Sequence, residues 1–428
     1  MVEVKPFRGV LYNKKKVKDI RLVLTPPYDI IDKEEEKVYS ENSPYNIVRL
    51  ILPEGDGNRY GNAAKTLDKW LREGVLLQDD KPAFYLYEEE FYLEDGEIRR
   101  RLGFMAAVKV EEYEKKIILP HENIMSKPAE DRLNLMKSCK ANMEPIFAIY
   151  DDPRNVTRSM LEMEGKRAPL IEFTDDSEIK HKLWSITDEN SIKRIQDAMA
   201  KRTLYIADGH HRYQASLDYK KKFKSSGADY TLMFLVDIND PGMVILPTHR
   251  VIKKLKKFDE QSFEKKLLDY FDVTVYKFEE KNEVEQRNKM FKYLGYMRND
   301  HAFGIFAGGK KYYLVSLKDK SLIDKELNGK KSRAWRELDA AVLHYILMEK
   351  VLGFNTNGKE YEENILFVKD RDKAIEMVYN EGCRIALFMN ATKPEQVMKV
   401  ADNGERMPQK STYFYPKPLS GLVIRKIE

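Results

Sequence analysis

The stretch Leu204-Tyr-Ile-Ala-Asp-Gly-His-His-Arg-Tyr-Gln-Ala215 carries the strongest structural signal in the sequence. The apolar run 205–207 predicts a strand, Asp208-Gly209 predicts a turn, and residues 213–223 have the composition of a helix. The first backbone N–H groups of a helix have no intrahelical partner, and the helix dipole favours negative charge there. A strand, a glycine turn and a helix in this order therefore predict an anion-binding site.

The side chains at this turn add directed donors to the predicted anion site. We expect Gly209, His210, His211 and Arg212 to bind a phosphate group, because two imidazoles and a guanidinium follow the turn directly. Arg212 in particular can bind phosphate through two parallel hydrogen bonds. The carboxylate of Asp208 is placed to hold a metal ion or a substrate hydroxyl.

Length and composition indicate a soluble globular protein with a heavily charged surface. The 428 residues are enough for two or three domains, and 42% of them are hydrophobic while 34% are charged. The net charge of +5, from 75 basic and 70 acidic residues, gives no reason to expect nucleic acid as a partner.

The sequence features that bear on location favour the cytoplasm. Cys139 and Cys383 have neither the CxxC spacing nor a metal pattern, which fits a reducing compartment. The first residues lack the apolar stretch of a signal peptide, and no apolar run approaches the length of a membrane span. We expect a cytoplasmic protein that does not enter the membrane.

A change in composition near residue 255 divides the chain. The lysine-rich segment 253–257 opens a region of alternating helix and strand patterns, so we predict one region over 1–255 and a second over 256–428. In the first region, the proline-bounded residues 43–53 predict a strand, and 62–76 predict a helix that stops near Gly74. In the second region, 338–350 predict a helix, and the aromatic segment 411–416 is expected to be packed.

Four of the seven histidines fall in three short motifs, at 119–127, 204–215 and 246–250. For His121 in the first motif, a structural hydrogen bond and a functional role are both open. For Thr248, His249 and Arg250 in the third motif, a contact to a carboxylate or phosphate competes with a surface cluster at the end of a strand.

Glu122 is the candidate general base. A hydroxyl group that attacks a phosphoryl group needs a positioned carboxylate to accept its proton, while cations neutralise the developing charge. The alternative for a glutamate in such a loop is a solvated side chain, and the sequence does not decide whether Glu122 and Asp208 meet.

Several well-known catalytic motifs are missing from the sequence. The segment 307–311, Ala-Gly-Gly-Lys-Lys, lacks the first glycine and the Ser/Thr of a phosphate loop, and there is no GxGxxG after a strand, no HExxH and no GxSxG. The 25 tyrosines and the basic residues are spread along the chain and do not follow the pattern of a nucleic-acid-binding module.

The chain resembles a prokaryotic family that is catalogued as a domain of unknown function and that carries an Ala-Asp-Gly-His-His-Arg-Tyr signature. The resemblance covers nearly the whole chain and rests on seven segments: 26–29 (PPYD), 44–50 (PYNIVRL), 119–122 (LPHE), 131–132 (DR), 207–213 (ADGHHRY), 246–250 (LPTHR) and 413–417 (YFYPK). Asp-Gly-His-His-Arg is also similar to the phosphate-binding signature of the ParB/sulfiredoxin superfamily. The free L-serine kinases of that superfamily pair an upstream Pro-His-Glu with a downstream Asp-Gly-His-His-Arg, as this chain does.

The resemblance implies an α+β fold with a ParB/sulfiredoxin-like mixed α/β core and long N-terminal and C-terminal α/β elaborations. It implies a kinase that uses Mg²⁺ and ATP or ADP to phosphorylate free L-serine or a similar hydroxy compound. Glu122 would be the catalytic base, Asp208 would act at the metal and the hydroxyl, and residues 209–212 would bind the nucleotide phosphates. Weaker assignments are that Lys127 and Arg132 assist the phosphates, and that His121, Thr248, His249 and Arg250 contact the substrate.

The chain departs from the compact serine kinases through long segments before, between and after the two motifs, which bears on the substrate more than on the phosphate chemistry. The alternative is a ParB-like regulator that binds or hydrolyses a nucleotide; the near-neutral charge and the lack of a helix-turn-helix pattern count against it. Residues 256–428 could cap the site, bind the adenine or mediate association into an oligomer.

Overall fold

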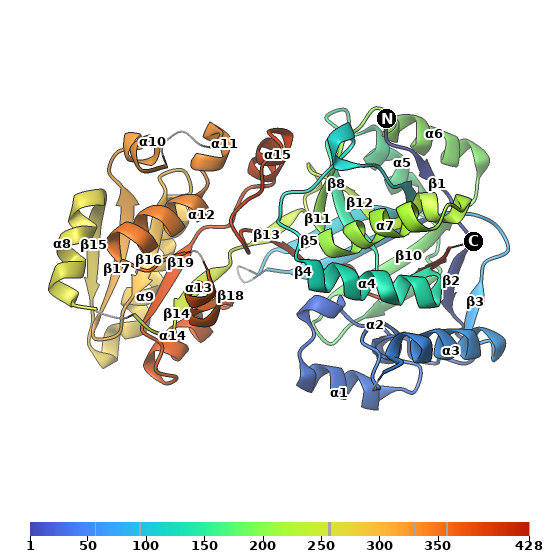
Figure 1. Cartoon of the computed structure of the whole chain (residues 1–428), viewed down its shortest axis with the longest axis horizontal. Helices are drawn as coiled ribbons and strands as arrows, with labels where there is room; N and C mark the ends of the chain where they lie inside the picture. Colours follow the sequence, from blue (N-terminus) through green and yellow to red (C-terminus); the bar gives the residue numbers. More distant parts are fainter. Residues whose placement is uncertain (56, 94–95, 256–257, 328–330, 357, 428) are drawn as a thin grey trace. The chain divides into compact units, whose positions relative to one another are not determined.

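The computed structural model describes every residue except 56, 94–95, 256–257, 328–330, 357 and 428. The chain forms two compact units, residues 1–244 together with 414–428, and residues 245–413 (Figure 1). We predicted a single division between residues 255 and 256, of which residue 256 lies outside the described part of the chain. In the structure, the last residues of the chain return to the first unit.

A nine-stranded mixed sheet forms the centre of the first unit. Its order is β6-β11-β8-β12-β5-β4-β10-β9, with β1 paired to β5 beside this path. The strands are β1 (Val4–Lys5), β4 (Phe84–Tyr92), β5 (Ile98–Lys109), β6 (Ile118–Leu119), β8 (Ile146–Tyr150), β9 (Ile171–Thr174), β10 (Lys180–Ile186), β11 (Leu204–Asp208) and β12 (Tyr230–Asp237).

Helices cover one face of this sheet. They are α5 (Val156–Glu164), α6 (Glu189–Met199) and α7 (His210–Lys222), and their apolar residues pack on alternate residues of the strands in one core. Helix α4 (Ser126–Cys139) lies beside α7 and contacts it through Met136, Ala215 and Tyr219 (Figure 1). The pair α4 and α7 places the residues after β6 and β11 next to each other.

The opposite face of the sheet carries aromatic side chains and the C-terminal segment. Phe414 packs its ring edge-on against Phe147 of β8 at 5.7 Å, and Tyr415 does the same against Phe91 of β4 at 5.4 Å. The aromatic tail is therefore packed, as its composition predicts. A four-stranded sheet, β3-β2-β21-β7, completes the unit with β2 (Gly9–Tyr12), β3 (Leu76–Gln78), β7 (Ala141–Asn142) and β21 (Ile424–Lys426).

The N-terminal part of the first unit contributes α1 (Lys33–Asn42), α2 (Val48–Ile51) and α3 (Arg59–Arg72). The predicted helix over 62–76 corresponds to α3, and Gly74 follows its end with a φ of +66°. The strand predicted within 43–53 is wrong, because Val48–Ile51 form a helical turn. The amide oxygen of Asn46 accepts the N–H of Val48 at 2.9 Å, and a short, mostly apolar run does not distinguish a strand from a helix.

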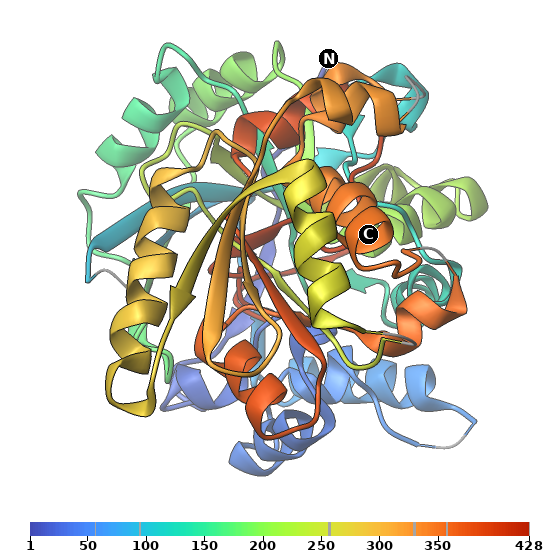
Figure 2. The ribbon, with the colours of Figure 1, turned by 90° about the vertical axis from the view of Figure 1, so that its left-hand side faces the viewer.

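The second unit is a three-layer structure around a six-stranded sheet of order β15-β17-β16-β19-β14-β18. Neighbouring residues of its strands point to two separate cores, so Val251 and Tyr312 face one side while Ile252 and Tyr313 face the other. Figure 2 looks onto this unit, with helices on both sides of the strands. The strands are β14 (His249–Ile252), β15 (Phe271–Lys277), β16 (Ala302–Phe306), β17 (Lys311–Leu317), β18 (Ile365–Val368) and β19 (Ile385–Met389).

The helices of the second unit are α8 (Glu260–Tyr270), α9 (Glu283–Tyr296), α10 (Ser321–Leu327), α11 (Arg333–Arg336), α12 (Asp339–Val342), α13 (Lys359–Asn364), α14 (Arg371–Tyr379) and α15 (Pro394–Asp402). The helix predicted over 338–350 is present, and from Leu343 to Val351 it continues as a π-helix. The short strands β13 (Val244–Leu246) and β20 (Tyr413–Tyr415) lie where the chain passes from one unit to the other.

The predicted mixed α/β fold is confirmed, since helices and several sheets make up both units. Within the ranges that the structure describes, no helix has the length and apolar composition needed to cross a membrane.

Candidate functional site

Two parallel strands bring the first and second histidine motifs together. β6 pairs in parallel with β11, with Leu119 opposite Tyr205. Parallel strands end at the same edge of a sheet, so Pro120-His121-Glu122 and Asp208-Gly209-His210 leave it side by side. The meeting of Glu122 with this turn, which the sequence left open, follows from that pairing.

Gly209 is required at the turn for two reasons. Its φ of +90° lies in the left-handed region, which residues with a Cβ rarely adopt. A Cβ at this position would also lie 2.9 Å from the guanidinium carbon of Arg212. The glycine therefore lets the Arg212 side chain fold back over the start of α7, and no side chain caps that helix end.

Asp208 is buried between two cations. Its Oδ2 accepts from Arg212 at 2.5 Å, and its Oδ1 accepts from the ammonium group of Lys417. Burial alone raises the pKa of Asp208, but the positive charges of Lys417 and Arg212 together hold it well below its usual range. Asp208 is thus an anion at any physiological pH, and both of its oxygens are occupied by cations.

Arg212 is fixed at both ends of its guanidinium. Besides Asp208, it donates to the carbonyl oxygen of Pro145 at 2.5 Å. Burial lowers its pKa, but the charges of Asp208 and Glu144 more than offset this and raise it. Arg212 is therefore a permanently charged, preorganised group at the start of α7.

His210 and His211 bind the backbone of the loop that carries Glu122. The Nε2 of His210 accepts the N–H of His121 at 3.3 Å, and the Nε2 of His211 accepts the N–H of Met125 at 3.1 Å. A nitrogen that accepts from an amide carries no proton, so we infer that both rings are neutral with the proton on Nδ1. The two consecutive histidines thus hold the loop in place through hydrogen bonds that do not involve an anion.

Glu122 faces this arrangement with part of its carboxylate open to solvent. Its Oε2 lies 3.7 Å from the Nδ1 of His210, and its side chain is about a third exposed (32%). That distance is too long for a hydrogen bond but brings the carboxylate next to the imidazole ring. Of the carboxylates described in this cluster, Glu122 is accessible while Asp208 is enclosed.

His121 has a structural role in the site. It is fully buried, and its Nδ1 donates to the carbonyl oxygen of Ile206 at 2.7 Å. Its ring packs at a right angle against that of His210, with 4.7 Å between the ring centres. His121 therefore joins the end of β11 to the Glu122 loop.

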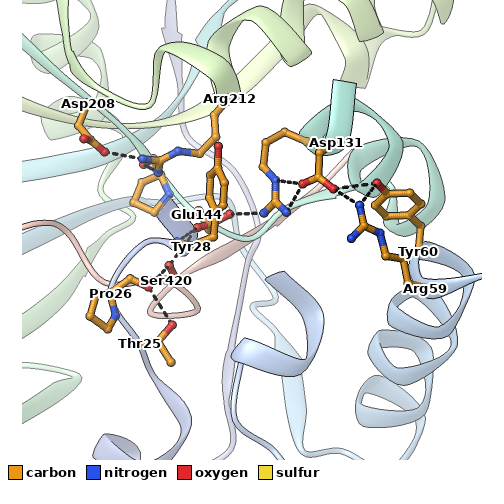
Figure 3. A network of polar contacts seen from close by, with 12 residues as sticks. Thr25, Pro26, Tyr28, Arg59, Tyr60, Asp131, Glu144, Asp208, Arg212 and Ser420 are labelled. Atoms are coloured by element: carbon orange, nitrogen blue, oxygen red, sulfur yellow. Dashed lines mark hydrogen bonds and ion pairs between the residues drawn. The ribbon is translucent and has the colours of Figure 1, made fainter. Parts of the chain in front are cut away.

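Arg132 joins Asp131 and Glu144 through ion pairs, in a second polar network that is drawn in Figure 3. Its guanidinium donates to Asp131 at 2.5 Å and to Glu144 at 3.2 Å, and it stacks over the ring of Tyr28 at 3.9 Å. Glu144 also accepts the N–H of Tyr28 at 2.9 Å. Arg132 thus holds the Pro26–Asp29 turn, whereas Lys127 is exposed in the first turn of α4.

Thr248, His249 and Arg250 lie in the second unit and make their contacts there. Arg250 is fully buried and donates to the carbonyl oxygens of Thr248, Gln409 and Lys410, the last two at 3.2 and 3.1 Å. Burial lowers the pKa of His249 to about 3, with Arg250 as a further cause. The interactions described for this motif are therefore internal to its own unit.

The residues of the site do not form a dedicated metal cage. Across the described ranges of the chain, no group of three or more His, Cys, Asp or Glu side chains could hold a metal ion. Asp208, which we predicted as a metal ligand, already has a cation on each oxygen. With so few protein ligands on offer, a Mg²⁺ ion at this site would keep several of its waters, as Mg²⁺ commonly does in proteins.

Lys417 is the site residue that the sequence reasoning missed. It belongs to the Tyr413–Lys417 segment on which the family resemblance rests, but the aromatic residues there suggested only packing. A lysine at the end of an otherwise aromatic motif was the available signal, because a segment that only packs needs no charge at its end.

A family model described as "Protein of unknown function (DUF1015)" matches residues 4–341. Among curated proteins, no sequence matches the chain. Solved structures with a weak likeness to this chain include a free serine kinase in complex with AMP, with 13% identity and a TM-score of 0.33 over 73% of this chain and 86% of that one.

Two other solved structures have a similar level of likeness. A conserved hypothetical protein from Pyrococcus furiosus has 14% identity and a TM-score of 0.31, over 73% of this chain and 89% of that chain. SbnI with C-terminal truncation from Staphylococcus aureus has 11% identity and a TM-score of 0.33, over 74% and 85%. TM-scores this low carry no conclusion about function, so the geometry of this chain's own site is the basis for one.

Proposed function

The chain belongs to the DUF1015 family of proteins of unknown function, and we propose that it is a phosphotransferase that moves a phosphoryl group from ATP or ADP to the hydroxyl group of a small molecule. Free L-serine, which would give O-phosphoserine, is the first substrate to test. The observation that carries the proposal is an accessible carboxylate, Glu122, beside a preorganised cationic helix start at Arg212.

Glu122 acts as the general base. As the substrate oxygen bonds to phosphorus and the bond from phosphorus to the nucleotide oxygen breaks, the hydroxyl proton passes to the Glu122 carboxylate. The nucleotide leaves with one phosphate fewer, and Glu122 later releases the proton to water. The imidazole of His210 lies 3.7 Å from this carboxylate and is its polar neighbour in the site.

Arg212, Lys417 and the first N–H groups of α7 supply the positive charge for the phosphates. Phosphoryl transfer depends mainly on in-line positioning and on charge neutralisation, and groups that are fixed in advance cost no reorganisation. Asp208 has a different role from the one we predicted. Because cations hold its pKa far below the usual range, it cannot take a proton from the substrate, and it fixes the two cations instead.

A Mg²⁺ ion would enter the site with the nucleotide and would neutralise charge on its phosphates. The residues of the chain then have separate tasks: Glu122 takes the proton, Arg212 and Lys417 bind the phosphates, and His210 and His211 hold the loop 121–125. Lys127, exposed at the start of α4, remains a candidate phosphate contact. A substrate contact through Thr248, His249 and Arg250 stays a prediction.

Product formation with a panel of donors and acceptors tests the proposal. The full-length protein is incubated with Mg²⁺, ATP or ADP, and L-serine, L-threonine, ethanolamine or glycerate, and phosphate esters are followed by phosphorus NMR. A new ester with at least one pair is the expected result. No ester with any pair, from protein that unfolds cooperatively, would overturn the proposal.

The same experiment addresses the alternative of a ParB-like regulator. Release of inorganic phosphate without an ester would favour a nucleotide-hydrolysing protein. Binding to duplex DNA that weakens steeply with salt would favour the regulator as well, because each neutralised phosphate adds to the salt dependence.

A further inference from the structure

A buried ion pair lies in the first unit, on the sheet face opposite its helices. Arg101 of β5 and Glu89 of β4 are direct partners across the two strands, and the exposed fraction of each side chain is zero. The guanidinium donates to Glu89 Oε2 through Nε at 2.8 Å and through Nη2 at 2.5 Å. The proposed reaction uses neither of these side chains.

Arg101 also binds the backbone of the C-terminal segment. Its Nη1 donates to the carbonyl oxygen of Tyr415 at 3.2 Å, and its Nη2 donates to that of Pro416 at 2.5 Å. These are the two residues that directly precede Lys417. The guanidinium of Arg101 therefore connects the middle of the sheet to the backbone that directly precedes Lys417.

Aromatic rings fix the plane of the guanidinium. Its carbon lies 4.7 Å from the ring centre of Phe147 and 5.7 Å from that of Phe234. Phe147 is in turn the strand partner of Asp208, and it packs against Phe414 of the C-terminal segment. Arg101 and the Asp208–Lys417 pair thus share one rigid neighbour.

Burying this ion pair is costly, and apolar side chains of similar volume often serve the stability of a core as well. The bonds to two consecutive carbonyl oxygens are what an apolar pair could not provide. They hold the backbone just before a lysine whose long side chain has many rotamers, so they restrict where its ammonium group can lie.

We propose that Arg101, held by Glu89, is a positioning residue that fixes residues 415–416 so that the ammonium group of Lys417 lies on Asp208. This inference rests on the proposed function only where it concerns catalysis, because the placement of Lys417 is measurable by itself. Arg101 acts through Lys417 and does not touch the reacting atoms.

Arg425 offers a matched control. It is a buried arginine of the same C-terminal segment, on β21, and it also donates to two backbone carbonyl oxygens, those of Tyr230 at 2.9 Å and Gly227 at 2.8 Å. It holds the segment at a point beyond Lys417. Arg425→Met therefore removes the same kind of anchor without touching residues 415–416.

The test measures the acylation rate of Lys417 with an amine-reactive acetylating reagent, followed by peptide mass spectrometry. In the wild type Lys417 is only 8% exposed and paired, so it should react slowly. Arg101→Met should raise its rate at least about tenfold, whereas Arg425→Met should leave it within about twofold. An unchanged rate in Arg101→Met, or an equal rise in both variants, would overturn the proposal.

A second measurement connects the positioning role of Arg101 to the proposed reaction. Arg101→Met should weaken nucleotide binding less than Lys417→Met does, and in the Lys417→Met background it should have no further effect. Additive losses would overturn the positioning role.

If the wild type forms no phosphate ester while Arg101→Met still exposes Lys417, the proposed function fails and the positioning role stands. If Arg101→Met does not fold, Arg101→Lys, which keeps the charge but loses the fork of donors, carries both measurements.

Discussion

Arg212 in the first unit and Arg250 in the second follow a histidine in a short motif, and both are buried, but their surroundings are opposite. Arg212 is paired with Asp208 and shares it with Lys417, and nearby carboxylates raise its pKa. Arg250 donates to backbone carbonyl oxygens, and burial lowers its pKa to about 10. In the part of the chain that the structure describes, no carboxylate lies at ion-pair distance from Arg250.

The difference shows what separates a charged site from a structural cross-link. At Arg212, one carboxylate stabilises two cations at the start of α7, so the three groups together keep a net positive charge there. At Arg250, the guanidinium connects β14 to the backbone of residues 409–410. Among the described residues, no carboxylate pairs with its charge. A His-Arg pair in a sequence is thus compatible with either arrangement, and the position of a carboxylate distinguishes them.

Removing the guanidinium of Arg212 gives the largest expected loss of stability, and removing that of Arg250 is the comparison. Arg212→Met leaves Asp208 with Lys417 alone, so we expect a loss of about 3 kcal/mol of unfolding free energy, at the low end for a broken buried pair, together with loss of nucleotide binding. Arg250→Met should cost about 1 kcal/mol, because the carbonyl groups left unpaired are partly offset by removal of a buried charge.

Urea unfolding and nucleotide titration of both variants check this pair. Because the proposed phosphate contacts do not include Arg250, its replacement should leave the nucleotide dissociation constant within about twofold. Equal losses of nucleotide affinity in the two variants would remove the distinction between the motifs.

A smaller effect is expected at the glycine under Arg212. In Gly209→Ala, the left-handed backbone and the 2.9 Å approach to the Arg212 guanidinium act together, so we expect a loss of about 2 kcal/mol or more and weaker nucleotide binding. Gly74→Ala is the matched control: its φ is +66°, but the nearest atom to its Cβ, in Leu77, is 4.0 Å away. It should cost about 1 kcal/mol without an effect on binding, and thermal unfolding compares the two.

The smallest effect concerns the pH dependence of the second unit. The pKa of His249 is about 3 in the folded chain and about 6.5 in the unfolded chain, so protons bind the unfolded state more strongly. Its stabilising contribution is complete above pH 6.5 and is lost as the pH falls toward 3. His344, whose pKa is also about 3 through burial, contributes in the same direction.

His249→Asn keeps an acceptor for the N–H of Met389 and removes the titrating ring. Between pH 6.5 and 5, the unfolding free energy of the wild type should fall by about 2 kcal/mol more than that of this variant, at about 1.4 kcal/mol per pH unit. Parallel curves for the two proteins in urea unfolding at each pH would contradict the assignment.

Sequence reasoning could reach the strand, turn and helix at 204–222, because apolar spacing, Asp-Gly and the following polar cations are local signals. It could not decide between strand and helix at Val48–Ile51, because four residues are too few to show either periodicity. It could not foresee that the Nε2 atoms of His210 and His211 accept the N–H groups of a loop some ninety residues earlier in the chain. Anion binding by these two residues stays a prediction.

The role of Lys417 was the least accessible to sequence reasoning. Its contact with Asp208 joins residues 209 positions apart and depends on the return of the C-terminal segment to the first unit. A single sequence has no local signal for such a contact. The same holds for Arg101, whose charge looks like part of the exposed run Arg99-Arg100-Arg101 until the pairing with Glu89 buries it.

The most direct test of the account is Glu122→Gln, compared with the wild type and with Glu130→Gln, which changes an exposed glutamate of α4 near the same loop. Single-turnover transfer to the accepted substrate and the nucleotide dissociation constant are measured on the same three proteins. We predict that Glu122→Gln lowers the transfer rate by about 10² to 10⁴, with nucleotide binding within about twofold, and that Glu130→Gln changes neither. A Glu122→Gln protein that transfers phosphate at the wild-type rate would contradict the account.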